Sequence, residues 1–470
     1  MQRRDFLKMA GVCAVGLAIP RVLQADDGNK PSFASAASEG KPNIIFILAD
    51  DLAQGDLGCF GQKKIKTPNL DRMASEGIKF TQLYTGTSVC APSRASLMTG
   101  LHMGHCPIRA NREIKGSEGQ MPLPTDVPTV AEIMKSAGYA TACTGKWGLG
   151  MFDTTGSPLK KGFDHFFGYN CQRHAHKYFP DYLYSDDKQI KLDGKTYAQN
   201  LIADDTFKWI KTHSSAPFFL FAAWTLPHAK YEIDNLGEYA ATDWDPQAKA
   251  YAAMISRLDT DVGRLLALLK ELKLDEKTLV IFSAGDNGSS FDPEGKLGKF
   301  FAQATDKHFR GFKRTMYEGG LRQGGLVRWP GKVPAGKVSD EPWAFWDLMP
   351  TCAELAGVKL PENAKTDGIS VVPGLLGGEM PKRPYFYWEL HEPNFMQATR
   401  FDNWKAVRPK PGAPVEIYDL KTDPGEKNDL AKKNPEILAK AEEILKTARV
   451  DSPDWPMEKT KKKAGKKAKS

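Results

Sequence analysis

The sequence predicts an α/β protein with a large, mainly parallel sheet flanked by helices, followed by a smaller C-terminal part that combines an antiparallel sheet with a helix. Two observations support this. Short apolar runs alternate with amphipathic helical patterns over most of the chain, which is typical of a parallel sheet wrapped by helices. Near the C-terminus the runs follow one another closely instead. The 470 residues are enough for one large domain and a smaller one.

Five apolar runs form the predicted main sheet, and no internal repeat is visible. These runs are Asn43–Ala49, Tyr139–Cys143, Phe218–Ala223, Thr278–Ser283 and Leu326–Trp329. Between them, Thr129–Ala137 and Gln247–Leu272 have the spacing of amphipathic helices. The alternation predicts strand–helix–strand units.

The pattern changes near Gly377–Pro384. Three short strands and a last helix follow, at Tyr385–Leu390, Trp404–Val407, Val415–Leu420 and Asn434–Ala448. We therefore place a large domain at 43–379, a C-terminal subdomain at 380–458 and a solvated, lysine-rich tail at 459–470.

The N-terminus has the pattern of an export signal. Arg3-Arg4-Asp5-Phe6-Leu7-Lys8 matches the twin-arginine motif, and Met9–Pro20 is an uncharged apolar run. This run is too short to cross a bilayer as a helix but suits a signal-peptide core. The pattern predicts a signal peptide at 1–25, with cleavage possible as late as about residue 37, and a disordered lead at 26–42. An ordinary amphipathic N-terminal helix is the alternative.

The net charge of +8 comes from the two ends of the chain. The tail holds seven lysines and no acid, and the twin-arginine segment is also basic, so the body between them is nearly neutral. This balance argues against nucleic-acid binding by the body. With the export signal, it favours a protein that the twin-arginine translocase delivers to the periplasm or the outside of the cell.

Polar side chains follow four of the predicted strands. They are, in chain order, Asp50 and Asp51, Lys146, His228, and Asp286 with Asn287. Ligands of open α/β sheets bind outside the carboxyl ends of the strands, and parallel strands bring those ends to one edge. We therefore expect these residues, far apart in sequence, to meet there.

Four of these residues offer only oxygen ligands, namely Asp50, Asp51, Asp286 and Asn287. Oxygen ligands select a hard cation such as calcium or magnesium. An Asp-Asn-Gly sequence alone usually marks a tight turn, and an Asp-Asp pair alone is usually a solvated loop. Their joint occurrence at two strand ends favours the metal site.

The stretch Cys90-Ala91-Pro92-Ser93-Arg94, which continues to Gly100, carries the strongest chemical signal. Pro92 suits a first helical position and Gly100 a helix end. Cys90 would then lie just ahead of a helix N-terminus, which favours anions, with Arg94 one turn along. This arrangement faces a nucleophile toward a sulfate or phosphate group. A buried structural cysteine is the alternative.

This stretch resembles the motif that maturation enzymes read in type I, formylglycine-dependent sulfatases, which belong to the alkaline phosphatase superfamily. Two other stretches are similar to further sulfatase signatures: Phe309–Arg322, with Lys313, and Thr144–Gly150, with Lys146. A surface charge is the alternative for each lysine. The resemblance covers roughly residues 43–457, from the first predicted strand onward, and implies an alkaline-phosphatase-like fold.

The resemblance implies an arylsulfatase-like sulfuric ester hydrolase. Cys90 would be converted to formylglycine by a formylglycine-generating enzyme. Calcium, rather than magnesium, would be held by the four oxygen ligands and an oxygen of residue 90. One hydroxyl of the hydrated aldehyde would attack sulfur, and the other would then drive the expulsion of sulfate.

The resemblance also implies roles for the charged residues. Arg94, Lys146 and Lys313 would stabilise the charge on the sulfate oxygens. His228 would protonate the leaving alcohol, with a structural histidine as the alternative. The family often has a histidine where this chain has Gly148, which leaves the base of the second step open. His176 or His174 is a candidate from another loop, and both could instead contact substrate or lie on the surface.

The expected substrate of an exported sulfatase is a sulfated carbohydrate, either algal polysaccharide or host glycan, and small aryl sulfates are also expected to react. The segment Phe163–Tyr184, with Trp388, Glu389, His391 and Glu392, could line a sugar pocket or belong to the core. A phosphodiesterase or phosphonate hydrolase of the same superfamily is one alternative. A catalytically silent, exported glycan-binding protein is the other.

Overall fold

The computed structural model describes residues 40–115, 119–301 and 309–457, and the described residues from 41 onward belong to one compact unit. The predicted signal peptide, nearly all of the lead and the lysine-rich tail lie outside the described residues. None of the helices that are described has both the length and the apolar character needed to cross a membrane.

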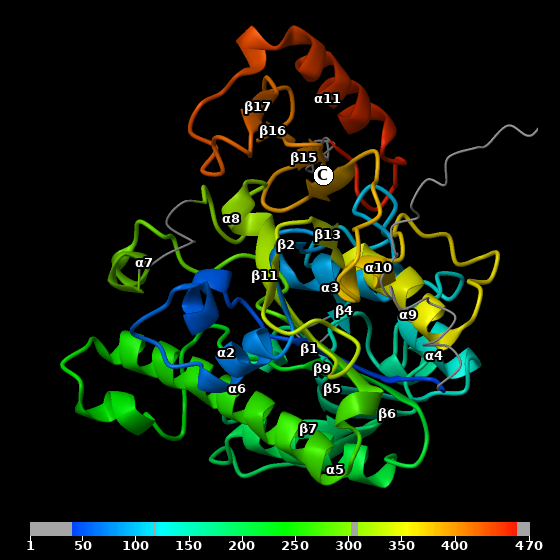
Figure 1. Ribbon diagram of the computed structural model, residues 1–470, viewed down its shortest axis with the longest axis vertical. Coiled ribbons are helices and arrows are strands. Elements are labelled where there is room, and N and C mark those ends of the chain that lie inside the picture. The colour runs from blue at the N-terminus through cyan, green and yellow to red at the C-terminus, as the bar shows by residue number, and fades with distance from the viewer. Residues whose placement is uncertain (1–39, 116–118, 302–308, 458–470) are drawn as a thin grey trace, which may run out of the picture. The chain divides into compact units, whose positions relative to one another are not determined.

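The main sheet contains eleven strands within the described residues, in the order β12-β2-β11-β10-β1-β9-β5-β6-β7-β8, with β13 beside β2 (Figure 1). The strands are β1 Asn43–Leu48, β2 Ile78–Tyr84, β5 Ala140–Lys146, β6 His165–Tyr169, β7 Tyr182–Ser185, β8 Lys188–Lys191, β9 Phe218–Ala223, β10 Thr278–Ser283, β11 Arg322–Arg328, β12 Lys337–Ser339 and β13 Trp343–Ala344. The central strands β10, β1, β9, β5 and β6 are all parallel.

Helices cover both faces of this sheet. Successive side chains of β1 point to opposite faces, so Ile45 and Ile47 join one apolar cluster while Ile44 and Phe46 join the other. On the first face lie α2 Pro68–Ser75, α5 Ala198–Thr212 and α6 Pro246–Glu271, and on the second lie α3 Cys90–Thr99, α4 Val130–Ser136, α9 Leu348–Ala356 and α10 Val372–Leu375. The first cluster also takes in α7 Lys296–Phe301. The parallel strands are buried on both sides, which fixes their register and therefore the positions of their carboxyl ends.

A second sheet follows near the C-terminus. Its four antiparallel strands are β14 Phe386–Leu390, β15 Met396–Phe401, β16 Trp404–Arg408 and β17 Glu416–Asp419, and α11 Pro435–Thr447 contacts β15 and β16. Trp388 of β14 packs on Tyr84 and donates a hydrogen bond to the backbone oxygen of Thr85. The domain boundary at residue 380 stays a prediction, because the two sheets belong to the same compact unit. A short hairpin, β3 Glu113–Lys115 and β4 Gly119–Gln120, completes the strands.

The predicted fold class is confirmed, with two corrections. The run Leu326–Trp329 belongs to β11, which is antiparallel to β10. β11 begins directly after α8 Glu318–Leu321, and its Gly325 lies opposite Ser283, the last residue of β10, while its last residue, Arg328, lies opposite Val280. β11 therefore starts beyond the carboxyl end of β10 and runs back. The second correction is that β5 continues to Lys146, so this lysine ends the strand instead of following it.

Candidate active site

The carboxyl ends of β1, β5, β9 and β10 bring the predicted polar residues together. The Nζ of Lys146 lies 2.7 Å from Oδ2 of Asp50. The Nε2 of His228 lies 3.3 Å from Oδ2 of Asp51. Asp286, which follows β10, is linked to the same group through Arg94. The expected convergence of residues from distant parts of the sequence is therefore present.

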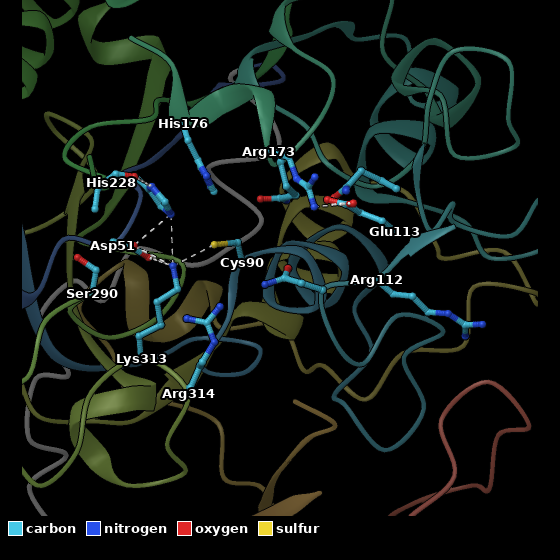
Figure 2. Close-up of a pocket in the computed structure, with 14 residues that line it drawn as sticks. Asp51, Cys90, Arg112, Glu113, Arg173, His176, His228, Ser290, Lys313 and Arg314 are labelled. Atoms are coloured by element: carbon cyan, nitrogen blue, oxygen red, sulfur yellow. Dashed lines mark hydrogen bonds and ion pairs between the residues drawn. The ribbon is translucent and has the colours of Figure 1, made fainter. Parts of the chain in front are cut away.

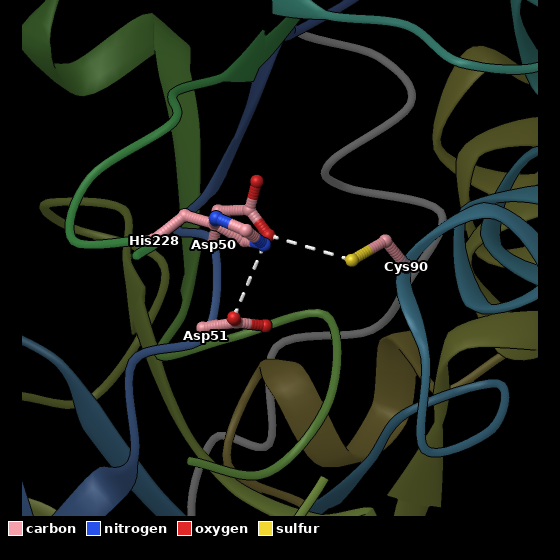
Figure 3. A group of neighbouring side chains, drawn as sticks. All are labelled: Asp50, Asp51, Cys90 and His228. Atoms are coloured by element: carbon pink, nitrogen blue, oxygen red, sulfur yellow. Dashed lines mark hydrogen bonds and ion pairs between the residues drawn. The ribbon is translucent and has the colours of Figure 1, made fainter. Parts of the chain in front are cut away.

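Cys90 lies at the centre of this group (Figure 3). It is the first residue of α3, so the helix begins two residues before Pro92, the predicted first helical position. Gly100 ends the helix in the left-handed region, with a φ of 70°. The Sγ of Cys90 lies 3.5 Å from Nζ of Lys313 and 3.8 Å from Oδ1 of Asp50. Burial raises the pKa of the Cys90 thiol to about 12. An unmodified thiol here stays protonated near neutral pH and is a weak nucleophile.

The oxygen-bearing residues fit a hard cation. Asp286 and Asn287 are fully buried, yet within the described residues their Oδ1 atoms accept no hydrogen bond. Buried polar oxygens without partners are costly, and a bound cation would satisfy them. Burial and the neighbouring charge of Asp50 raise the pKa of Asp286 to about 6. Asp50 and Asp51 complete a set of four hard ligands, and their carboxylates lie within 4.8 Å of the Cys90 and His228 ligand atoms.

Two lysines keep the first two carboxylates ionised. Burial acts to raise the pKa of Asp50, but the charges of Lys146, His228 and Arg94 outweigh it and lower that pKa. In Asp51, the charge of Lys313 outweighs burial in the same way. The Nζ of Lys313 lies 2.7 and 2.8 Å from the two Asp51 oxygens. These ion pairs hold the carboxylates as anions at the bottom of the site.

Arg94 is fully buried behind these groups. Its Nε donates to Oδ2 of Asp286 at 2.8 Å, and its Nη1 donates to the backbone oxygen of Lys146 at 2.8 Å. This position orients Asp286 and the end of β5. A direct contact between Arg94 and a sulfate oxygen stays a prediction.

A cavity of about 630 Å³ opens above Cys90, and Asp51, His176, His228 and Lys313 line it (Figure 2). The cavity puts a polar floor that includes the Lys313 cation next to a residue at a helix N-terminus. Such a floor suits a tetrahedral oxyanion ester.

Comparisons with known proteins identify the family. The model of the Sulfatase family matches residues 42–358, and the model of the N-sulphoglucosamine sulphohydrolase C-terminal region matches residues 308–451. The chain belongs to the sulfatase family. It is 33% identical to N-acetylgalactosamine-6-sulfatase of Canis lupus familiaris over 379 residues, which cover 75% of this chain and 70% of the relative.

Further relatives agree with this assignment. Arylsulfatase A of Homo sapiens is 31% identical over 484 residues, 89% of this chain and 90% of the relative. The crystal structure of Ps i-CgsB in complex with k-i-k-neocarrahexaose shares 28% identity at a TM-score of 0.79, covering 89% of this chain and 95% of that one. This sulfatase is thus a sulfuric ester hydrolase with an alkaline-phosphatase-like fold.

Two histidines of the sulfatase stack on each other at the wall of the cavity. The rings of His176 and His228 stack with centroids 4.3 Å apart and an angle of 13° between their planes. Burial, with the neighbouring His228, lowers the pKa of His176 to about 3, and burial also lowers the pKa of His228. His174 instead stacks on Tyr182 and is not among the residues that line the cavity. Of the two candidates for the second base, only His176 reaches the site.

Gln172 occupies the space next to Gly148. A Cβ at Gly148 would lie 2.0 Å from Nε2 of Gln172, and Gly148 has a φ of 77° that favours glycine. Within the described residues, this Nε2 is buried without a hydrogen-bond partner, and Gln172 lines the cavity. Sequence reasoning missed Gln172 as a donor, although it searched the same segment for a histidine.

Within the described residues, none of the C-terminal residues named for a sugar pocket lines the cavity. Trp388 and Glu389 are fully buried, so for these two the alternative of a core role holds. Glu389 accepts hydrogen bonds from Arg109 and Arg449, and it lies 3.0 Å from His391. Arg173, from the segment Phe163–Tyr184 named for a sugar pocket, does line the cavity. The cavity wall also includes residues that the sequence did not predict, namely Asn111, Arg112, Glu113, Gln120, Ser290 and Arg314. Most lie in loops without a motif, so only the neighbour of Lys313, Arg314, had a sequence signal.

Proposed function

We propose that this sulfatase removes sulfate from sulfated carbohydrate, with formylglycine at position 90 and a calcium ion beside it. The observation that carries the proposal is the position of Cys90, buried at the start of α3 between Lys313 and Asp50 on the floor of the cavity. Two similar proteins support the substrate class, because one is named for a sulfated amino sugar and the other was solved with a neocarrahexaose.

The modification at position 90 explains the nucleophile. A hydrated aldehyde supplies one hydroxyl for attack on sulfur and a second hydroxyl whose deprotonation expels sulfate. A thiol or a serine hydroxyl lacks the second group. The side chain at position 90 lies next to Lys313, which keeps its charge because Asp51 outweighs burial and raises the lysine pKa. Lys313 therefore neutralises negative charge on the sulfate oxygens.

A calcium ion would be held by Asp50, Asp51, Asp286 and Asn287. Asp286 and Asn287 carry the buried oxygens that accept no hydrogen bond within the described residues, and Asp50 and Asp51 belong to the cluster around Cys90. When bound, it supplies a Lewis acid that polarises sulfate oxygens. Calcium is preferred over magnesium because it accepts many protein oxygens in flexible geometry. Arg94 and Lys146 fix the carboxylates in place.

Two histidines handle protons in the proposed reaction. The Nδ1 of His228 is hydrogen-bonded to the backbone oxygen of Ala229, so Nε2 faces the cavity. In its protonated form, His228 donates from Nε2 to the leaving alcohol. His176 is neutral and stacked beside it, which suits it to accept the proton of the hydroxyl that remains on residue 90.

The test combines mass spectrometry with rates. The protein is produced in a host that makes formylglycine, and the peptide containing residue 90 is weighed. Release of sulfate from an aryl sulfate is then compared with release of phosphate from the matching aryl phosphate. We expect an aldehyde at position 90 and a preference for sulfate. Full activity with an intact thiol would falsify the nucleophile, and a phosphate preference would favour the phosphodiesterase or phosphonate hydrolase alternative.

We also propose that the twin-arginine translocase exports the protein to the periplasm or beyond. The support is the sequence of residues 1–25 alone. A reporter fused to residues 1–42 should leave the cytoplasm, whereas the same fusion carrying Arg3→Lys and Arg4→Lys should stay inside. Export of both fusions would contradict the assignment.

A further inference from the structure

Among the described residues, the cavity wall carries three arginines, and two of them are paired at short range. Arg112 donates to Asp454 at 3.1 Å, and Arg173 donates to Glu113 at 2.8 Å. Arg314 differs, because its ion pair with Glu392 is longer, with Nε 3.3 Å from Oε1. Within the described parts of the chain, its two terminal nitrogens donate no hydrogen bond, and the side chain is 52% exposed. Arg314 therefore presents a guanidinium edge to the cavity.

The position of this guanidinium is tied to the nucleophile. The backbone N–H of Arg314 donates to the oxygen of Ser88 at 2.9 Å, two residues before Cys90. Its partner Glu392 accepts the backbone N–H of Asn111 at 2.7 Å, and Oδ1 of Asn111 accepts the N–H of Ala91 at 3.0 Å. Figure 2 shows the Arg314 side chain directed toward Cys90 from the same loop as Lys313.

The backbone at this position is unfavourable for an arginine. Arg314 has a φ of 70°, in the left-handed region where glycine is unstrained and residues with a Cβ are not. Strained residues of this kind cluster at ligand sites, where the side chain or its exact placement is needed. An arginine that is strained, half exposed and aimed into the cavity indicates a binding role.

We propose that Arg314 forms a second anion subsite, in which its terminal nitrogens bind a sulfate or carboxylate group carried by the sugar beside the ester that is cleaved. A planar guanidinium matches such oxyanions with two parallel hydrogen bonds. In this proposal Lys313 binds the sulfate that is cleaved and Arg314 binds the second anion, so two adjacent residues bind two anionic groups of one substrate. The inference rests on the proposed function and narrows the substrate to sugars with at least two anionic groups.

The test uses matched ligands. Galactose and N-acetylgalactosamine monosulfates are each compared with the corresponding disulfate, and with a disaccharide that adds a uronate carboxylate. The kcat/KM for sulfate release is measured for the active enzyme, and Kd is measured by calorimetry for the inactive Cys90→Ala protein. We expect the wild type to prefer one kind of doubly charged ligand by about tenfold, equivalent to ~1.4 kcal/mol. The ligand that is preferred, disulfate or uronate disaccharide, shows whether the second anion is a sulfate or a carboxylate.

Three variants decide the role of Arg314. Arg314→Gln should remove the preference for the second anion, with a larger loss on doubly charged than on singly charged ligands, and Arg314→Lys should keep part of it. Arg264→Gln is the matched control, because Arg264 on α6 is also partly exposed, at 43%, and paired with an aspartate. A wild type without the preference, or an Arg314→Gln protein that keeps it, overturns the subsite. A failure of the proposed function looks different: no sulfate is released from any ligand, while the Kd ratios of the Cys90→Ala protein still decide the subsite.

Discussion

Lys313 contacts more of the reacting groups than any other cation described above. Its Nζ reaches Asp51, the Sγ of Cys90 and Nε2 of His228, at 2.7, 3.5 and 3.4 Å. Because it carries a full charge in a buried position, its electrostatic effect is much stronger than that of a surface lysine. The chemistry of the site is therefore most sensitive to this residue.

We expect Lys313→Gln to lower kcat/KM on an aryl sulfate by about 10²–10³, because a preorganised donor to the sulfate oxygens is lost. The variant should also unfold at a lower temperature, since the buried Asp51 carboxylate loses its closest cation. Lys208→Gln, an exposed change on α5, is the control and should behave as wild type. An activity of Lys313→Gln within threefold of wild type would contradict the role of this lysine.

The second half of the reaction is tested at His176. We expect His176→Ala to accumulate enzyme sulfated at position 90, because the proton acceptor for the remaining hydroxyl is missing. Rapid quenching followed by mass spectrometry measures the trapped fraction. His174→Ala is the control, since this ring belongs to the same segment but stacks on Tyr182 away from the cavity. Equal amounts of trapped enzyme in both variants would mean that the base lies elsewhere.

Sequence alone located the residues of this site that belong to motifs or strand ends, such as Cys90, Asp50 and Lys313. Their positions follow from the register of buried parallel strands and from one helix start, which short patterns encode. Gln172 and Arg314 were not predicted, because their roles depend on a neighbour distant in sequence. The space beside Gly148 is defined only once β5 and the loop after β6 are side by side.

At the scale of elements, α8, β16 and the loop after β17 share one buried ion network. The Nζ of Lys405 lies 2.7 Å from Glu318 and 3.2 Å from Glu426, and all three side chains are fully buried. Burial, with the charge of Glu318 acting against that of Lys405, raises the pKa of Glu426 to about 7. In Glu318 the charge of Lys405 outweighs burial and lowers the pKa to about 2. Arg322 and Arg400 add to the lowering of the Glu318 pKa, which leaves Glu426 as the carboxylate that is not fully compensated.

This network predicts a pH-dependent stability. A carboxyl whose pKa is raised in the folded state stabilises most below its unfolded pKa, and that stabilisation is lost as pH rises through about 7. We expect the free energy of unfolding of Glu426→Gln to exceed that of wild type by about 1–3 kcal/mol at pH 8, and to differ little from it near pH 5. Denaturant unfolding at both pH values measures this. Glu442→Gln, an exposed change on α11, is the control and should show no such pH dependence. A Glu426→Gln protein that is less stable than wild type at pH 8 would contradict the prediction.

Elements with strong periodicity were predicted well, and those without it were not. The predicted helix Gln247–Leu272 is observed as α6, Pro246–Glu271, and the side chain of Asp245 caps its first turn. β2 was missed because polar residues interrupt it where one face is only half buried. β8 was missed because all four of its residues are exposed. Such strands are formed by pairing with neighbours and not by their own composition.

At the scale of the whole molecule, the bound cation should contribute to stability as well as to activity. It would join the ends of β1 and β10, which lie at the centre of the sheet. We expect chelation to lower both Tm and kcat, and added calcium to restore both. A ligand at a concentration a hundredfold above its Kd adds about 2.7 kcal/mol to the free energy of unfolding. Calcium should no longer raise Tm in Asp286→Asn, whereas Asp340→Asn, far from these ligands, should respond as wild type. A Tm that ignores both chelator and calcium would exclude the site.

The near-complete burial of Cys90, which is 3% exposed, determines the order in which the proposed oxidation and folding can occur. If Cys90 is converted to formylglycine as proposed, the maturation enzyme cannot take this side chain into its own pocket once α3 has packed, so the oxidation has to precede folding. A chain that folds too early keeps its sulfur permanently, and the fraction of competent molecules reflects a race between two rates. We expect the maturation enzyme to convert the unfolded chain or an excised peptide, and to leave the native thiol form unchanged when the products are weighed.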